Sequence, residues 1–133
     1  MPRKLLLTFT VAAALLAAGP AFAHHGTAGY DMVKVVTVKG TVTKVEWNNP
    51  HVIFYIDGHI DSKDGGDIQH WSLEVSPPLL MDRFGWNKES LKPGDQVSAE
   101  THPARNGSPV GISGTASFLL KFVVNGTPLP HLP

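Results

Sequence analysis

The chain has 133 residues, with eleven Lys and Arg against eleven Asp and Glu, seven histidines and no cysteine. This is the length of one small domain. The charge balance argues against a nucleic-acid partner, which would need a basic stripe, and the lack of cysteine excludes a disulfide framework. We therefore expect an apolar core, or a bound ligand, to hold the fold together.

The first 23 residues have the features of a secretory signal peptide. Arg3 and Lys4 precede an apolar stretch, and Ala21-Phe22-Ala23 places small residues at the −3 and −1 positions of a cleavage site. The apolar stretch is too short and wrongly flanked for a stable membrane span. The sequence predicts a protein that is exported to the periplasm, with a single domain over residues 24–133 and no membrane span once the signal is removed.

Cleavage after Ala23 would make His24 the first residue of the exported protein, directly followed by His25. An α-amine has a pKa of about 7.7–8.0 and an imidazole one of about 6.5, so both lose their protons near neutral pH. Amine and imidazole nitrogens are ligands that Cu(II) and Zn(II) favour. The pair indicates a metal site at the processed terminus; the alternative is that it only begins an ordinary solvated chain end.

The pattern of apolar residues predicts five strands in the exported part. Runs rich in Val and Thr, or alternating between apolar and polar, cover residues 34–47, 51–57, 68–75, 96–101 and 116–124. Gly40 lies where the long first strand can bend or bulge. The Gly-rich stretch 103–114 is predicted to be a loop.

A short helix is predicted between the third and fourth strands. Ser76-Pro77-Pro78 is typical of a helix start, and the helix over residues 79–84 ends at Gly85. Three strands, a helix and two strands is the element order of the OB-fold. We therefore predict an all-β, small five-stranded antiparallel OB-like barrel. A β-sandwich is the alternative, but it requires about seven strands.

The second and third strands can be paired so that Asp57 lies opposite Ile68. Glu74 then lies opposite His51, with Tyr55 and His70 on the same face, while Val52, Phe54, Trp71 and Leu73 point into the core. A glutamate that accepts from one imidazole nitrogen fixes the tautomer and orients the other nitrogen toward a metal. The alternative is an ordinary stabilising cross-strand pair.

His102 ends the fourth strand near the expected barrel mouth and is a weaker candidate ligand. His59 and His131 are expected to be solvated. The sequence has no nucleophile elbow, no phosphate-binding loop and no H-E-x-x-H motif, so we assign no catalytic residue.

Several motifs of the chain form a recognisable set. They are His24-His25 after the signal, Tyr30-Asp31, Trp47-Asn48-Asn49-Pro50-His51, Trp71 with Glu74, Gly85-Trp86 and Pro93-Gly94-Asp95. The set resembles a family of small exported bacterial proteins that carries only a domain-of-unknown-function label (type 6152). The chain departs from the family at Gly26, where a serine is usual, and after Ser117. The resemblance implies export and a compact β fold, supplies no activity, and brings His24, His25, His51 and Glu74 into one motif set.

The favoured hypothesis is a periplasmic metal-binding protein, with copper preferred over zinc and no catalysis of its own. His24, His25 and His51 would be ligands and Glu74 would orient His51. The first alternative is a metal-free OB-type accessory module that binds a peptide, a glycan or a periplasmic partner protein. The second is a copper-dependent oxidative enzyme, because a terminal histidine with a second histidine resembles the copper brace of oxidative polysaccharide enzymes. Such an enzyme needs a broad substrate surface that so small a domain scarcely provides.

Overall fold

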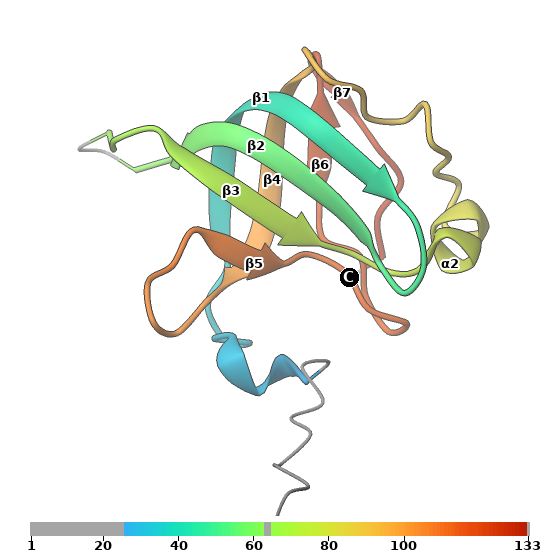
Figure 1. Cartoon of the computed structure of the whole chain (residues 1–133), viewed down its shortest axis with the longest axis horizontal. Coiled ribbons are helices and arrows are strands. Elements are labelled where there is room, and N and C mark those ends of the chain that lie inside the picture. The colour runs from blue at the N-terminus through green and yellow to red at the C-terminus, as the bar shows by residue number, and fades with distance from the viewer. Residues whose placement is uncertain (1–25, 63–64, 133) are drawn as a thin grey trace, which may run out of the picture.

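The computed structural model describes residues 26–62 and 65–132. Strands dominate it, and they form one curled sheet (Figure 1). The strands are β1 (Val36–Trp47), β2 (Val52–Ile60), β3 (Gln69–Glu74), β4 (Gln96–Pro103), β5 (Val110–Ile112), β6 (Phe122–Val124) and β7 (Thr127–Pro128). The two helical elements are a 3₁₀ turn, η1 (Thr27–Gly29), and a short α-helix, α2 (Pro78–Arg83). Within the described ranges, neither is long and apolar enough to cross a membrane.

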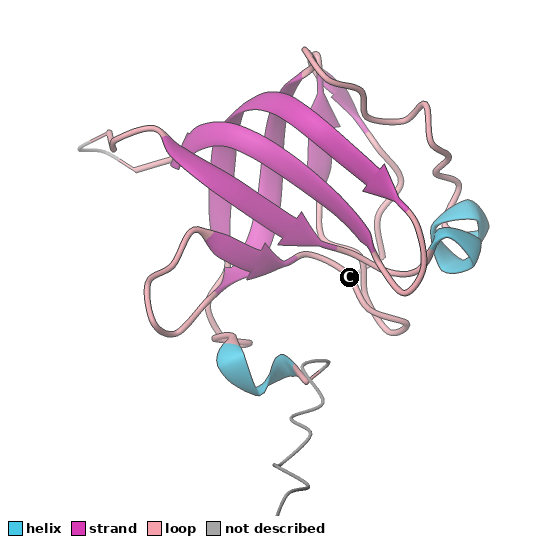
Figure 2. Cartoon of the chain, viewed as in Figure 1, coloured by secondary structure: helices cyan, strands magenta, loops and turns pink. Residues whose placement is uncertain are grey.

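The sheet closes on itself as a small barrel. The strand order is β1-β2-β3-β5-β4, and β1 also pairs with β4, which completes the ring; β6 and β7 continue the sheet from β4. Figure 2 shows the strands wrapped around the core, with α2 at one end. The predicted small all-β barrel with a short helix between the third and fourth strands is confirmed.

Two details of the predicted barrel were wrong. The fifth barrel strand was predicted over residues 116–124, and all strand pairs were predicted to be antiparallel. The barrel is closed by β5, within the stretch that was predicted to be a loop, and β5 runs parallel to β3 and antiparallel to β4. The predicted strand over residues 116–124 is reduced to β6, which pairs with β4. Gly111 explains the misleading signal: a Cβ there would lie 2.1 Å from the Thr101 Oγ1 atom. This glycine allows β5 to approach β4 closely and does not mark a loop.

Close backbone contact also shapes β1 and β2. A Cβ on Gly40 would lie 2.1 Å from the Asp57 carbonyl oxygen, and one on Gly58 would lie 2.3 Å from the Lys39 carbonyl oxygen. The register shift in the β1–β2 ladder comes slightly later, between Val42 and Lys44. Such a bulge increases the local twist, which helps one strand to pair with both of its neighbours in the ring.

The predicted register of β2 and β3 was wrong by two residues, although the faces were predicted correctly. Glu74 lies opposite Ile53, and Leu73 lies opposite Phe54. A shift of two residues keeps every side chain on its own face. Val52, Phe54, Trp71 and Leu73 are accordingly buried, whereas His51, Tyr55, His70 and Glu74 are exposed or half-buried.

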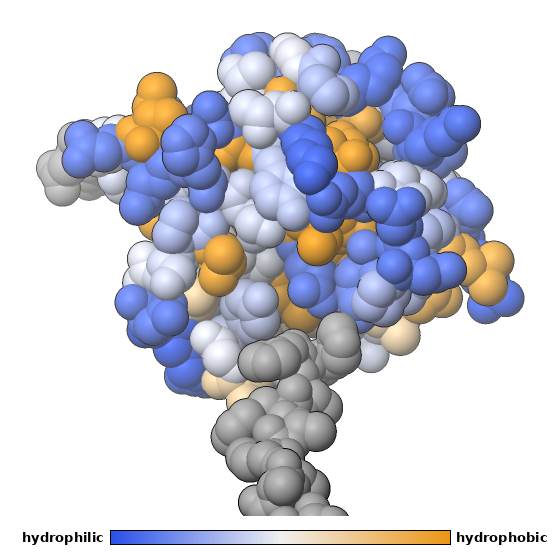
Figure 3. Space-filling view, in the orientation of Figure 1, coloured by the Kyte–Doolittle hydropathy of each residue, from blue (hydrophilic) through white to orange (hydrophobic). Residues whose placement is uncertain are grey.

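An aromatic cluster fills the barrel near α2. The Trp86 and Phe122 ring centroids lie 5.1 Å apart and nearly perpendicular, and both rings are close to Phe54. The Trp86 indole N–H donates to the Pro130 carbonyl oxygen at 2.7 Å. These rings are packed core and leave no room for a ligand among themselves. In the view of Figure 3 hydrophilic residues cover much of the surface, and apolar residues form separate patches.

Candidate functional site

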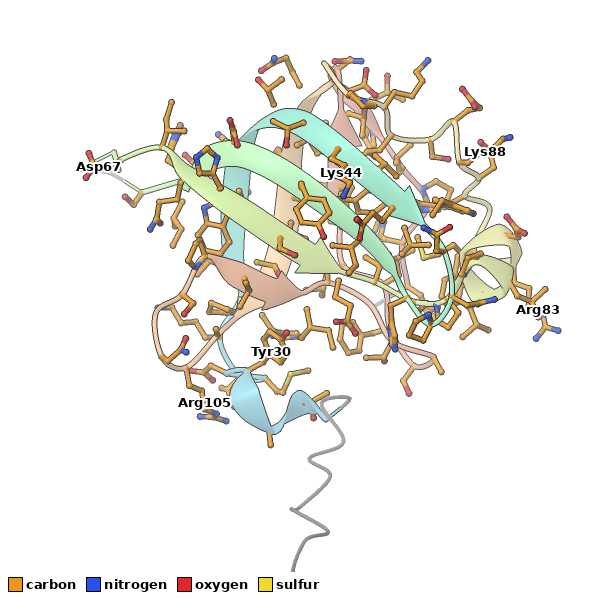
Figure 4. The ribbon with its side chains drawn as sticks, viewed as in Figure 1. Tyr30, Lys44, Asp67, Arg83, Lys88 and Arg105 are labelled. Carbon is orange, nitrogen blue, oxygen red and sulfur yellow. The ribbon has the colours of Figure 1, made fainter. Side chains whose placement is uncertain are left out.

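The segment before β1 is fixed against the end of β4. The Asp31 amide donates to the Pro103 carbonyl oxygen at 2.9 Å, and the Arg105 amide donates to the Gly29 carbonyl oxygen at 2.9 Å. Tyr30 forms an isolated antiparallel bridge with Ala104, and Figure 4 shows it between η1 and the barrel. These bonds bring the N-terminal part of the described chain to the side of the barrel where β3 and β5 end.

A cavity of about 310 Å³ lies between this segment and the barrel. Its polar lining residues are Thr27, Tyr30, His51, Glu74, Ser76 and Thr115. Its apolar lining residues are Pro77, Leu80, Ile112 and Ala116, and Ile112 is the strand neighbour of Glu74. Gly26, the first described residue, also lines the cavity.

His51 is positioned by the turn between β1 and β2 and by the start of β2. It follows the cis Asn49–Pro50 peptide bond, and the Val52 amide donates to the Ser76 carbonyl oxygen at 3.2 Å. The His51 Nδ1 atom lies 3.0 Å from the Glu74 Oε1 atom and 3.1 Å from the Val75 carbonyl oxygen. Both neighbours are oxygen acceptors, so in the neutral ring Nδ1 carries the hydrogen and Nε2 carries the lone pair. The sequence predicted that Glu74 would accept from one ring nitrogen but did not specify which one.

The contact between His51 and Glu74 was predicted, but its geometry differs from the prediction. Glu74 lies directly opposite Ile53 and reaches His51 diagonally. Diagonal neighbours in an antiparallel pair are within reach of long side chains. Both side chains are about 30% exposed (29% and 30%), so the pair lies at the surface of the cavity and is not part of the core.

Tyr30 is a residue of this cavity that sequence reasoning did not assign to the site. Burial raises the pKa of its phenol, and the negative charge of Glu74 raises that pKa further. The phenol is therefore neutral at physiological pH and can donate a hydrogen bond. Its signal in the sequence was a large aromatic residue within a stretch of small ones and its place in the Tyr30-Asp31 motif.

The remaining predicted residues lie in different places. His102 does not line the cavity: its Nδ1 atom lies 2.8 Å from the Lys34 carbonyl oxygen, and its ring meets Phe118 edge-on. The predicted signal peptide and His24 and His25 fall outside the described residues. Residues 26–62 and 65–132 contain no group of three or more His, Cys, Asp or Glu that could hold a metal.

A second histidine–carboxylate pair provides a useful contrast. The His70 Nδ1 atom lies 2.6 Å from the Asp57 Oδ1 atom, but the His70 side chain is 89% exposed. Neither residue lines the cavity. The pair shows that a histidine next to a carboxylate is not enough to define a site in this protein.

Comparison with known families finds one family whose model matches the chain. The profile of one family matches residues 13–114, which is most of the chain. The chain belongs to a family of unknown function (DUF6152). The resemblance predicted from the motifs is thus confirmed. The matched range includes the five strands of the barrel and ends shortly after Ile112. No curated protein and no solved structure matches the chain.

Proposed function

We propose that this protein is an exported metal-binding protein, with copper preferred over zinc, and that the ion is held at His51 in the cavity. The observation that carries the proposal is that Gly26 lines the same cavity as His51 and Glu74. In this proposal His24 and His25, which directly precede Gly26 in the sequence, complete the site together with His51.

The ligands come from distant parts of the chain. His51 supplies Nε2, and Glu74 holds the ring through Nδ1, an arrangement that raises the basicity of a ligating imidazole. His24 supplies its α-amine and imidazole, and His25 supplies a further imidazole. With nitrogen donors of this kind, divalent copper binds more tightly than zinc. The described residues alone lack a complete ligand set, so the site depends on the processed terminus.

The decisive experiment is calorimetric titration of Cu(II) and Zn(II) into protein that begins at His24. One added residue ahead of His24 converts the α-amine into an amide and leaves every imidazole in place. We expect Cu(II) affinity to fall at least about tenfold, or roughly 1.4 kcal/mol. His51→Ala should cost a similar amount, whereas His131→Ala, the matched control, should leave the affinity unchanged.

Two further measurements constrain the proposal. N-terminal sequencing of the exported protein should give His24 as its first residue. Affinity should also weaken as the pH falls through the imidazole and amine range, because protons compete for the ligating nitrogens. Unchanged Cu(II) affinity in the extended protein would contradict the proposal, and the metal-free module that binds a peptide, glycan or partner protein would then be the better account.

A further inference from the structure

We propose that this protein has a second binding site, for a small organic monocarboxylate with an apolar body, at the edge of the barrel where β1 and β3 begin and β2 and β4 end. Among the described residues, this site shares no lining residue with the cavity that contains His51. It is therefore independent of the proposed metal.

A pocket of about 240 Å³ lies at this edge. It is lined by Val36, the first residue of β1, by Ile60, the last residue of β2, and by Trp71, near the start of β3. Pro103 at the end of β4 and the loop that follows it also contribute. Neighbouring antiparallel strands run in opposite directions, so the start of one lies beside the end of the next. The pairing of β1 with both β2 and β4, and of β2 with β3, thus gathers four strand ends around one space.

The pocket carries positive charge that no ion pair neutralises. Lys34 and Arg105 both line it, and neither forms an ion pair with another residue of the described ranges. Asp31 also lines it, but its Oδ1 atom accepts from the Val33 and Lys34 amides at 3.2 and 3.3 Å. Two cations against one carboxylate leave a net positive charge of one on the lining. This charge suits a monocarboxylate better than a phosphate group, which carries about −1.5 to −2.

Trp71 supplies the second observation that points to a ligand. It is 3% exposed, and its indole N–H has no hydrogen-bond partner among the described residues. The buried Oγ1 atom of Thr101, the strand partner of Val36, likewise lacks a partner within this part of the chain. Buried polar groups in proteins are nearly always paired. Because Trp71 lines the pocket, a carboxylate that enters it brings an acceptor to the ring that lacks one.

The rest of the lining favours an apolar body of limited size. Val36, Ile60, Pro103 and Ala104 are apolar, and an aromatic ring of the ligand can pack edge-on or offset against the Trp71 indole. The volume of about 240 Å³ lies below the ~300–1,000 Å³ range of sites for drug-sized ligands. A single ring with one carboxylate matches these limits, and benzoate is the simplest probe.

The probes are benzoate, benzamide, benzylamine, acetate and inorganic phosphate, each titrated into ¹⁵N-labelled protein freed of metal by dialysis. Benzamide keeps the ring without the charge, benzylamine reverses the charge, and acetate keeps the carboxylate without the ring. The Trp71 indole N–H signal in the NMR spectrum reports binding. We expect benzoate to shift it saturably and benzylamine to leave it in place. Benzamide and acetate should bind at least about tenfold more weakly, because each lacks either the charge or the apolar body. The Trp86 signal, whose N–H already donates to Pro130, should not move.

Lys34→Gln and Arg105→Gln each remove one charge of the pocket, and Arg83→Gln is the matched control. Figure 4 shows Arg105 beside η1 and Arg83 beyond α2, on the other side of the molecule. We expect each pocket variant to weaken benzoate binding about threefold or more, the effect of one charge at close range, and the control to leave it unchanged. Asp31→Asn retains an oxygen acceptor for the turn and should strengthen binding by a similar factor.

Several outcomes would overturn the site. They are a Trp71 signal that ignores benzoate, benzamide that binds as tightly as benzoate, and a loss of affinity in Arg83→Gln equal to that in Arg105→Gln. Phosphate that binds as tightly as benzoate would indicate an adventitious ion only. Unchanged backbone signals away from the pocket serve as the control for folding in every variant. Because the protein is free of metal throughout, none of these results bears on the proposed function, and a failure to bind copper would leave this site standing.

Discussion

At the residue scale, Glu74 is the group that orients the His51 ring toward the cavity. Partners of this kind typically change metal affinity 10–100-fold when they are removed. We expect Glu74→Ala to weaken Cu(II) binding by a factor in that range in a calorimetric titration. Asp57→Ala removes the carboxylate of the other histidine pair and should leave Cu(II) binding unchanged. Equal losses in both variants would indicate a general effect of surface charge.

Asp95 makes a contribution to stability that depends on pH. Its carboxylate accepts a hydrogen bond from the Asn125 side-chain amide at 3.0 Å and one from the Lys92 backbone amide at 2.8 Å. These bonds lower the pKa of Asp95, with the bond from Asn125 as the largest cause. The stabilisation is therefore complete above the ordinary aspartate pKa of about 3.9 and is lost as the pH falls through the lowered value.

We expect Asp95→Ala to reduce the free energy of unfolding by about 1 kcal/mol at neutral pH, the value of one or two exposed hydrogen bonds. In urea titrations at a series of pH values, the difference between wild type and variant should shrink below pH about 4. A difference that stays constant down to pH 2 would show that the carboxylate charge has no part in it.

The placement of some residues of the candidate site could be predicted from the sequence. Alternation along two strands placed His51 and Glu74 on the same face of the sheet, because a residue's face is determined by its parity. Their contact depends on the register, which alternation does not determine. Tyr30 could not be placed in the same way, since its position depends on hydrogen bonds between residues 29–31 and residues 103–105. Such tertiary contacts leave no periodic pattern in the sequence.

At the element scale, two glycines allow β1 and β2 to pass within close backbone distance. We expect Gly40→Ala to destabilise the barrel by about 1–3 kcal/mol or more, the typical cost of overpacking, because the new Cβ would lie 2.1 Å from a backbone oxygen. Gly29→Ala is the control, as no atom lies within 4 Å of a Cβ built there. Thermal unfolding of both variants tests this, and equal stability would contradict the close approach.

The long strands were predictable and the short ones were not. β1, β2 and β3 contain enough residues for an alternating pattern, whereas β5 has three residues, one of them Gly111. The predicted register of β2 and β3 was wrong by two residues. An alternating pattern repeats every two residues, so it cannot distinguish registers that differ by an even number of residues. Only the length and shape of the connection between β2 and β3 fixes that choice.

At the scale of the whole molecule, the proposed ligands and cavity walls join the N-terminal segment, β2, β3, α2 and the segment after β5. A metal that binds only this assembled state stabilises it by RT ln(1 + [L]/Kd), or about 2.7 kcal/mol at a hundredfold excess over Kd. For a domain of this size we expect Tm to rise by roughly 10 °C or more. At the same metal concentration the rise should fall to roughly half in His51→Ala, because a tenfold weaker Kd leaves about 1.4 kcal/mol of stabilisation. It should persist in full in His131→Ala, as followed by differential scanning calorimetry.

Closure of the barrel through the β1–β4 ladder also determines when the cavity can exist. Val36 pairs with Thr101, so the ring requires contacts between residues far apart in sequence, a topology of high contact order that folds slowly. The cavity is lined from Gly26 to Ala116, and a chain that emerges N-terminus first therefore presents its histidines well before the cavity walls are made. On the proposed function, the complete binding site would form at the end of folding, and tight metal binding would report that the barrel has closed.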